Sequence, residues 1–548
     1  MLENFDPNTI QDEAVRQVVI DLMNLVENLH AKVQEQAEEI QRLRDENNRL
    51  KGEQGKPAIK PNKPATALSS EKERRESKPH HKARKQTEIR IDRVEVVQVD
   101  HDRLPQDAQF KGYEEVIVQD IDFRTQNITF RKEKYYSPGQ KRTYLAPLPA
   151  GYHGQFGPGV RAWALALYYA AGMSEPKLLE LLHTVGMHIS AGQLSDFLVK
   201  GQEQFHAEHA AVVQAGLTSS PWHHLDSTGS RLDGQNQQCH VLCNPLYTAY
   251  STLPAKDRLS LLRVLLGGAE PTFCLNERAL TLLEQFGVAQ KWCKQLTKRL
   301  SHDQEWNESQ LDEVLDQHLL TLGTKSRKLI KDALAIAAYQ TQTTFPVVEL
   351  LVCDDAPQCN WLTAELALCW VHEYRHYKKL TPRLAYHRQR LDQFKETFWK
   401  LYRKLLAYRH HPNQKEADSL RGEFERLFGQ SSGYQQLDER KALTLAKKDA
   451  LLMVLSHPEI LLHNNPAELG ARQRVRKRDV SLQARTREGI RAWDTFQTLV
   501  TTAKKLGVNI YQYLHDRMTQ TNTFPSLATL IEERAKDFQF AASWLAGT

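Results

Sequence analysis

Two short apolar runs in this chain each lead directly into an aspartate, although they lie far apart in the sequence. In residues 223–230 a leucine precedes Asp226, a Ser/Thr/Gly stretch predicts a turn, and alternating residues then resume. Residues 350–353 are apolar and run straight into Asp354 and Asp355. The pattern predicts two strands that end in acids.

The residues around these two strands indicate a discontinuous core. Residues 246–253 predict a further strand, whereas apolar residues at helical spacing fill about 255–345 and 361–460. We therefore predict an α/β domain over residues 216–480 that carries two large helical insertions.

A third acid, Glu468, opens an arginine-rich helical stretch after an Asn-Asn-Pro-Ala sequence. Element ends place side chains rigidly at one edge of a sheet, where sites on open α/β sheets lie. Mg²⁺ prefers oxygen ligands, and two such ions about 4 Å apart can promote phosphodiester chemistry. Asp226, Asp354 and Glu468 are therefore candidate ligands of a two-metal site. The alternative is that both aspartates only cap turns.

Neighbouring acids leave the ligand set partly open. Adjacent residues on a strand point to opposite faces, so only one of Asp354 and Asp355 can face the site. Asp354 is favoured because it directly follows the apolar run, and Asp355 is its alternative. Asp233, beyond the predicted turn, is an alternative to Asp226.

Residues 372–376 match the zinc-protease pattern H-E-x-x-H. On a helix, His372 and His376 would share a face and could hold Zn²⁺, with Glu373 as the general base. The flanking Arg375 and lysines are typical of a solvated helix, and no third ligand stands out downstream. The favoured interpretation is therefore polar residues of an inserted helix.

Residues 10–51 carry an apolar heptad repeat. β-Branched residues at a, Leu at d and one Asn at a favour a parallel two-stranded coiled coil. Residues 1–52 are thus predicted to be a dimerisation helix, the alternative being an amphipathic helix packed on its own domain. The predicted dimer contacts are Leu22, Val26, Leu29, Val33, Ile40, Leu43, Asn47 and Leu50.

Three further segments precede the core. Residues 53–87 are rich in Pro, Lys and Ser and predict a basic disordered linker, which either keeps the chain soluble or holds DNA phosphates loosely. Residues 88–150 predict a small β module, with strands near 89–96, 115–118 and 127–131, that contacts DNA or acts as a spacer.

Residues 151–215 have the plan of a helix-turn-helix. Ser174 and Pro176 start one helix, a turn contains Gly186, and Ser190 caps a second helix. In a DNA-binding unit Gln193 and Lys200 could face a groove. Two packed helices of an α-helical domain fit the pattern equally well.

The helix after Glu468 and the helical region 481–548 are strongly basic. A solvated helix normally contains more acids, so phosphate contact is favoured. The candidate DNA-binding residues in this helix are Arg472, Arg474, Arg476, Lys477 and Arg478.

The composition narrows the class of protein. A hydrophobic content of 41% and a charged content of 26% are those of a soluble protein, and the net charge of +6 is modest. The seven cysteines form no CxxC pair, which indicates reduced cysteines in a cytoplasmic protein; Cys239 and Cys243 are interpreted as strand residues. The acidic amphipathic N-terminus is no signal peptide, and the longest apolar run, 162–173, is too short for a membrane span of about 20 residues.

At the three acids the sequence resembles the IS66-type transposases of the DDE superfamily. The matching pieces are residues 224–229, 352–356 and 464–468, and the Asn-Asn-x-Ala-Glu segment is the most specific. Residues 492–507 also look like the family's tail, so the resemblance covers roughly 150–515.

The resemblance implies an RNase H-like fold in which Asp226, Asp354 and Glu468 are the catalytic and metal-binding triad for two Mg²⁺ ions, with Mn²⁺ as a substitute. The implied activity is that of an insertion-sequence transposase, which cuts element ends and joins the 3′-OH to target DNA. The implied partners are double-stranded DNA (terminal inverted repeats and target), further copies in a homodimer or higher oligomer, and helper proteins. The implied location is the bacterial cytoplasm, at the nucleoid, without membrane contact.

The sequence departs from the family in two places. Many relatives carry a cysteine zinc-binding module before the catalytic domain, whereas this chain has no cysteine before Cys239. Ser227 stands where relatives often have an acid. The alternative function is a catalytically inactive DNA-binding or regulatory protein derived from a transposase.

Overall fold

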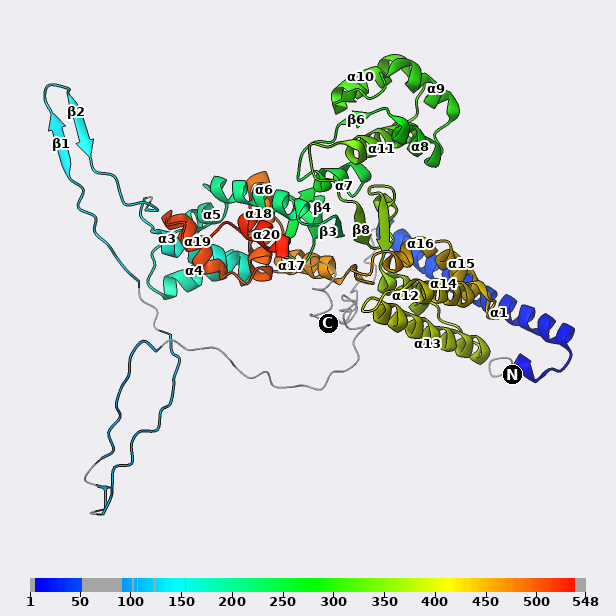
Figure 1. Ribbon diagram of the computed structural model, residues 1–548, viewed down its shortest axis with the longest axis horizontal. Coiled ribbons are helices and arrows are strands. Elements are labelled where there is room, and N and C mark those ends of the chain that lie inside the picture. Colours follow the sequence, from blue (N-terminus) through cyan, green and yellow to red (C-terminus); the bar gives the residue numbers. More distant parts are fainter. Residues whose placement is uncertain are drawn as a thin grey trace.

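The computed structural model describes residues 5–51, 91–100, 103–105, 107–121, 125–152 and 154–537 of the 548. The fold is mixed α/β and mostly helical, with a five-stranded sheet near its centre (Figure 1). The predicted linker 53–87 lies outside the described residues.

The sheet has the strand order β5-β4-β3-β8-β9. Strands β3, β4 and β5 form an antiparallel meander, and β8 and β9 run parallel to β3. The strands are β3 (Trp222–Leu232), β4 (Gln235–Cys243), β5 (Thr248–Leu253), β8 (Leu350–Cys353) and β9 (Glu365–Leu368). Strand β9 falls where helix was predicted, because four residues at a sheet edge are too few to reveal their period in the sequence.

Strand β3 is longer than predicted. Asp226 lies within it rather than at its end, because the residues from Ser227 to Leu232 keep pairing with β4. The turn instead contains Asp233 and Gly234, which have φ values of 45° and 75°. Two successive residues with positive φ suit the tight turn of a hairpin. The prediction of a turn directly after Asp226 is therefore wrong.

Helices α17 (Asn465–Ser481) and α18 (Arg487–Lys505) pack against the sheet, α17 on β3 and β4 and α18 on β5. The approach of α17 is close at Gly470, where an added Cβ would lie 2.6 Å from Val241 Cγ1. Only glycine allows this helix to lie so near the strands.

Two helical insertions interrupt the sheet, as predicted. The first contains a short ladder of β6 (Phe273–Cys274) with β7 (Glu305–Trp306) and the helices α7 (Arg258–Leu265), α8 (Glu277–Gln285), α9 (Gln290–Arg299), α10 (Glu308–His318) and α11 (Thr324–Thr341). The second contains α12 (Trp370–Lys378), α13 (Ala385–Tyr408), α14 (Gln414–Gly429), α15 (Gln435–Leu445) and α16 (Lys448–Leu451). They extend from the sheet as two separate lobes (Figure 1).

Helix α1 (Glu13–Leu50) is one continuous helix over the predicted coiled-coil segment. One of its faces packs on the second insertion, where Met23 is buried with Leu384 and Tyr386. Glu27 accepts a hydrogen bond from the Arg383 amide (2.7 Å) and lies 3.3 Å from His387 Nδ1. The intramolecular packing that stood as the alternative to a coiled coil is thus present over part of α1.

The predicted β module is largely wrong. The described residues between 91 and 133 form no strand, and the only strands before the core in the described chain are β1 (Lys134–Ser137) and β2 (Arg142–Leu145). Alternating residues make a strand only when a neighbouring strand supplies backbone partners, and the described residues of these segments pair with no strand. The β1–β2 hairpin projects from the body of the molecule (Figure 1).

The two helices predicted after residue 151 are confirmed as α4 (Glu175–Thr184) and α5 (Ala191–Val199). Ser190 caps α5 by accepting a hydrogen bond from the Gln193 amide (3.2 Å), and Gly186 in the connecting turn has a φ of 82°. They follow α3 (Pro158–Leu165), and α6 (Glu203–Thr218) leads into the sheet.

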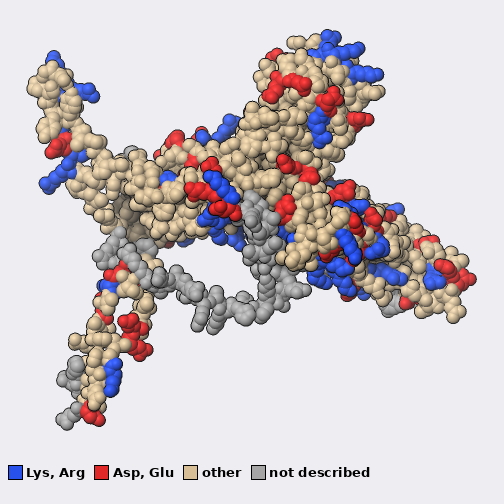
Figure 2. Space-filling model, in the orientation of Figure 1, with Lys and Arg blue, Asp and Glu red and all other residues tan. Residues whose placement is uncertain are grey.

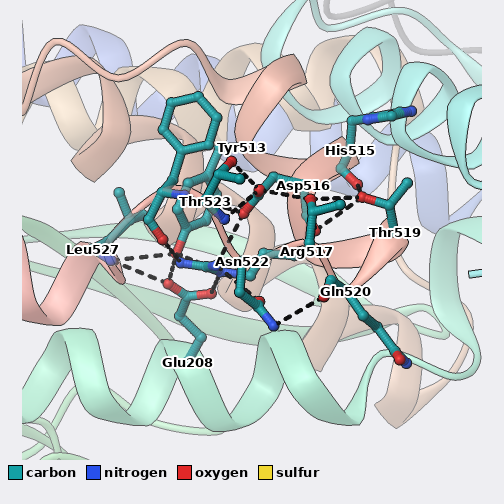
Figure 3. Close-up of polar contacts among 12 residues, drawn as sticks. Glu208, Tyr513, His515, Asp516, Arg517, Thr519, Gln520, Asn522, Thr523 and Leu527 are labelled. Atoms are coloured by element: carbon teal, nitrogen blue, oxygen red, sulfur yellow. Dashed lines mark hydrogen bonds and ion pairs between the residues drawn. The ribbon is translucent and has the colours of Figure 1, made fainter. Parts of the chain in front are cut away.

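Two C-terminal helices, α19 (Ile510–Thr519) and α20 (Leu527–Asp537), close the fold against α3 and α6. Glu208 on α6 accepts hydrogen bonds from the Tyr513 hydroxyl and from the Leu527 amide (3.2 Å) (Figure 3). Among the described helices, none has the length and apolar character needed to cross a bilayer.

Candidate metal centre

Strand register brings Asp226 and Asp354 to the same level of the sheet. β3 and β8 are parallel neighbours, and His224 lies opposite Val352. Two residues further on, continuation of this register reaches Asp226 on one strand and Asp354 at the end of the other. Neighbouring strands lie about 4.8 Å apart, and residues two apart share a face. The two aspartates therefore lie side by side.

Asn464 attaches the start of α17 to the same part of β3. Its side chain donates a hydrogen bond to the Leu225 carbonyl (2.7 Å), and its Oδ1 lies 3.0 Å from His224 Nδ1. Glu468 follows one helical turn later and is 9% exposed. The helix start thus delivers a third carboxylate beside the strand that carries Asp226.

The electrostatics of Asp226 include contributions from the other two acids. The pKa of Asp226 is raised to about 7, and desolvation by burial is the largest cause. The carboxylates of Asp354 and Glu468 also act to raise this pKa, whereas a hydrogen bond from the Ser227 amide (2.7 Å) acts to lower it. Carboxylates that repel one another in this way are stabilised by a cation held between them.

Asp355 has a different environment. It is exposed and forms an ion pair with Lys447, at the start of α16. Lys447 also lies 3.4 Å from Glu373 Oε2. Asp355 is therefore engaged by the second insertion rather than by the cluster around Asp226.

The H-E-x-x-H residues lie on α12 but are not arranged as in a zinc protease. Glu373 is buried and bound by Arg440 and Thr444. Burial opposes its ionisation, but the hydrogen bonds from Thr444 and Arg440 outweigh this and lower its pKa. His372 faces Glu468 instead, with Nδ1 3.7 Å from Oε1. A carboxylate held by two donors is unsuited to act as a general base.

Cysteines surround the cluster without a sequence signal that marks them. Potential ligand atoms of Cys353, Asp354 and Cys359 lie within 4.8 Å of one another, as do those of Cys369, His372 and Glu468. Burial raises the pKa of Cys369 to about 12. It is therefore a neutral thiol, which is a poor ligand for Mg²⁺.

Two of the predicted DNA-binding residues are buried. Arg474 is 0% exposed, forms an ion pair with Asp494 and lies over the Trp493 ring. Lys477 donates to the Tyr168 carbonyl (3.1 Å), and desolvation lowers its pKa to about 6. They cannot contact DNA in this fold, because every third or fourth residue of α17 faces the protein interior.

The other candidates lie nearer the surface. Arg476 and Gln193 are exposed, and Lys200 is exposed and paired with Asp196 (2.8 Å). Arg472 and Arg478 are half-buried, and Arg478 donates to the Gly229 carbonyl.

Parts of the chain are similar to known proteins. Residues 338–492 match the family described as Transposase IS66 family. An uncharacterized protein, y4jO, of Sinorhizobium fredii (strain NBRC 101917 / NGR234) is 29% identical over 328 residues, which are 59% of this chain and 100% of the relative. No solved structure matches the chain.

The matched segment includes β8, Asp354, the whole second insertion and Glu468, and it begins after Asp226. The resemblance inferred from the sequence is thus confirmed for this part of the chain. Residues 338–492 are thus similar to the domain of the IS66 transposase family.

Proposed function

We propose that the protein is the transposase of an insertion sequence, which cuts the element ends and joins the 3′-OH to target DNA. The observation that carries the proposal is the parallel register of β3 and β8, which aligns Asp226 with Asp354 beside Glu468. The strand order β5-β4-β3-β8-β9 is the one expected of an RNase H-like core. The family match covers two of the three acids.

The acids fit hard divalent cations. All three proposed ligands are carboxylates, and their mutual repulsion would be relieved by positive charge. Two Mg²⁺ ions, or Mn²⁺ in their place, would supply activation of the attacking oxygen and stabilisation of the leaving oxygen. Asp354 is the ligand we propose in place of Asp355, whose charge is paired with Lys447.

Polar and cationic side chains on the surface are the candidate contacts to double-stranded DNA, both at the element ends and at the target. Arg476, Gln193 and Lys200 are exposed, as are cations of the projecting hairpin. A two-stranded ribbon is narrow enough to enter the major groove, and the neutralisation of phosphates gives affinity. Figure 2 shows Lys and Arg on this hairpin, at the upper left.

Dimerisation through α1 is the proposed assembly. The heptad residues Leu22, Leu29, Val33 and Leu43 are exposed, whereas Val19 and Val26 are half-buried near the face that packs on the second insertion. A second copy would cover this apolar stripe. The exposed heptad residues of α1 could equally take part in a higher oligomer or bind a helper protein.

The test of the enzyme uses the three acids singly. Asp226→Asn, Asp354→Asn and Glu468→Gln should each lower Mg²⁺-dependent nicking of terminal-repeat DNA by several orders of magnitude and leave DNA binding nearly unchanged, because each variant removes a negative charge from the metal site. Nicking gels and filter binding on the same samples measure both. Asp355→Asn is the matched control and should keep activity. Cleavage that survives in one of the triad variants would remove that residue from the mechanism.

The second candidate function is a catalytically inactive regulator that binds element ends. Ser227, where relatives often have an acid, favours this reading. A wild-type protein that binds terminal repeats without any metal-dependent nicking would establish it.

A further inference from the structure

Helix α12 presents polar side chains in two directions. His372 and Arg375 face Glu468 on α17, whereas Glu373, between them, faces α15 and Lys447. His372 Nδ1 lies 3.7 Å from Oε1 of Glu468, and Arg375 Nη2 lies 3.9 Å from Oε2. Each carboxylate oxygen thus has a nitrogen of α12 as its neighbour.

Arg375 determines the tautomer of His372. Its Nη1 lies 3.0 Å from His372 Nε2. A guanidinium only donates hydrogen bonds, so Nε2 must be the acceptor. The proton of the neutral ring is therefore on Nδ1, the nitrogen that faces Glu468.

This tautomer separates two possible roles for the cluster. Cys369, His372 and Glu468 have the donor atoms of a zinc site. A ring nitrogen that carries a proton cannot bind a metal, and Arg375 blocks the exchange of tautomers by occupying Nε2 with a donor. The geometry therefore fits a donor that orients Glu468, and it does not fit a metal ligand.

We propose that His372 and Arg375 are positioning residues that hold the Glu468 carboxylate in the orientation needed to share metal ions with Asp226 and Asp354. The proposal rests on the proposed function of that cluster. The protonated Nδ1 of His372 faces one oxygen at 3.7 Å, and Arg375 places positive charge 3.9 Å from the other. Partners of this kind fix the direction of a ligating carboxylate, whose own side chain otherwise rotates freely.

The second insertion holds α12 in the required place. Buried Glu373 is bound by Arg440 and Thr444 of α15, and Lys447 links Glu373 to Asp355, next to Asp354. Trp370, the first residue of α12, is fully buried with its ring centroid 5.3 Å from that of Phe398 on α13. The packing of the second insertion thereby helps to position both Asp354 and Glu468.

A pair of substitutions at His372 tests the donor position. An Asn amide nitrogen can take the place of Nδ1, whereas the longer Gln places its nitrogen near Nε2. His372→Asn should keep Mn²⁺ affinity and Mg²⁺-dependent nicking within about threefold of wild type. His372→Gln and Arg375→Ala should each lower Mn²⁺ affinity or activity by roughly 10- to 100-fold. Calorimetry with Mn²⁺ alone gives the affinity.

His376→Ala, on the same helix, is the control and should behave as wild type; thermal unfolding checks that every variant is folded. Equal losses in His372→Asn and His372→Gln, or none in His372→Gln and Arg375→Ala, would overturn the proposal. If the wild-type protein does not nick DNA, the proposed function is wrong. The Mn²⁺ affinities of the same variants still show whether His372 positions Glu468. Tight binding of Zn²⁺ to the wild-type protein that is lost in His372→Asn would also refute the proposal that His372 is a positioning residue.

Discussion

Asp516 holds the C-terminal helices together through one carboxylate. It accepts hydrogen bonds from the Thr521 hydroxyl (2.8 Å) and from the Thr523 amide (2.7 Å) and hydroxyl (2.5 Å) (Figure 3). Burial opposes its ionisation, but these donors outweigh burial and lower its pKa to about 2. The charged form is thus the one that the loop between α19 and α20 stabilises.

A substitution at Asp516 should give a pH-dependent loss of stability. Because the folded pKa is below the unfolded value of about 3.9, its contribution is complete above about pH 4 and is lost as pH falls toward 2. Asp516→Asn should cost about 1–3 kcal/mol at pH 7, since an amide cannot accept from all three donors. Urea unfolding of the C-terminal helices at several pH values measures this.

The cost of Asp516→Asn should shrink as pH falls from 4 to 2. A cost that is the same at pH 7 and near pH 2 would show that the charge of Asp516 is not what the loop recognises. Glu532→Gln, on α20, is the control and should leave stability within about 0.5 kcal/mol, as expected for a surface substitution away from such contacts.

Helices in this protein use their faces for different partners. On α17, Arg474 and Lys477 face the interior while Arg476 faces outward. On α1, Met23 and Glu27 contact the second insertion, while the heptad residues from Leu29 onward are exposed. Intramolecular packing and a coiled coil can therefore coexist on α1, because its contacts with the second insertion lie before Leu29, and the heptad residues from Leu29 onward are exposed.

Oligomeric state should depend on the heptad face of α1 and not on its packed face. Leu29→Asp combined with Leu43→Asp should convert a dimer to a monomer, because each copy would place charge in the apolar seam. Glu35→Ala, outside the seam, should leave the dimer intact. Light scattering at several concentrations measures the mass. A wild-type monomer, or a dimer that survives both aspartates, would contradict the assembly.

The whole molecule presents the projecting β1–β2 hairpin away from the sheet and its acids (Figure 1). Lys134, Lys141 and Arg142 are exposed on it, together with Tyr135 and Tyr144. An isolated hairpin is only marginally stable in water, so a partner that covers it is expected. Its cations and aromatic rings suit nucleic acid.

Removal of the hairpin cations should weaken DNA binding in a salt-dependent way. Lys134→Gln, Lys141→Gln and Arg142→Gln together should reduce the slope of log affinity against log salt by about 2–3, if each cation neutralises one phosphate. Lys177→Gln is the control, since its charge is paired with Glu180 (2.7 Å). Fluorescence anisotropy at several salt concentrations gives both slopes. An unchanged slope would exclude the hairpin from the DNA interface.

Local patterns in the sequence predicted much of this protein. The heptad repeat predicted the helix α1, and the apolar runs predicted β3 and β8. Ser190 and Gly186 predicted the start of α5 and the turn before it. Such predictions succeed because periodicity and caps act over a few residues. The family resemblance pointed to Asp226, Asp354 and Glu468, and the family match includes the last two. The same patterns misplaced the turn after Asp226 and predicted strands before residue 134 that have no partner.

Only the tertiary structure decided which residues meet. The register of β3 with β8 aligned Asp226 and Asp354, and Asn464 fixed α17 beside them. The burial of Arg474 and the contact of His372 with Glu468 depend on which helix face packs inward. Pairing between strands and packing between helices join residues far apart in the chain, and no short stretch of sequence contains that information.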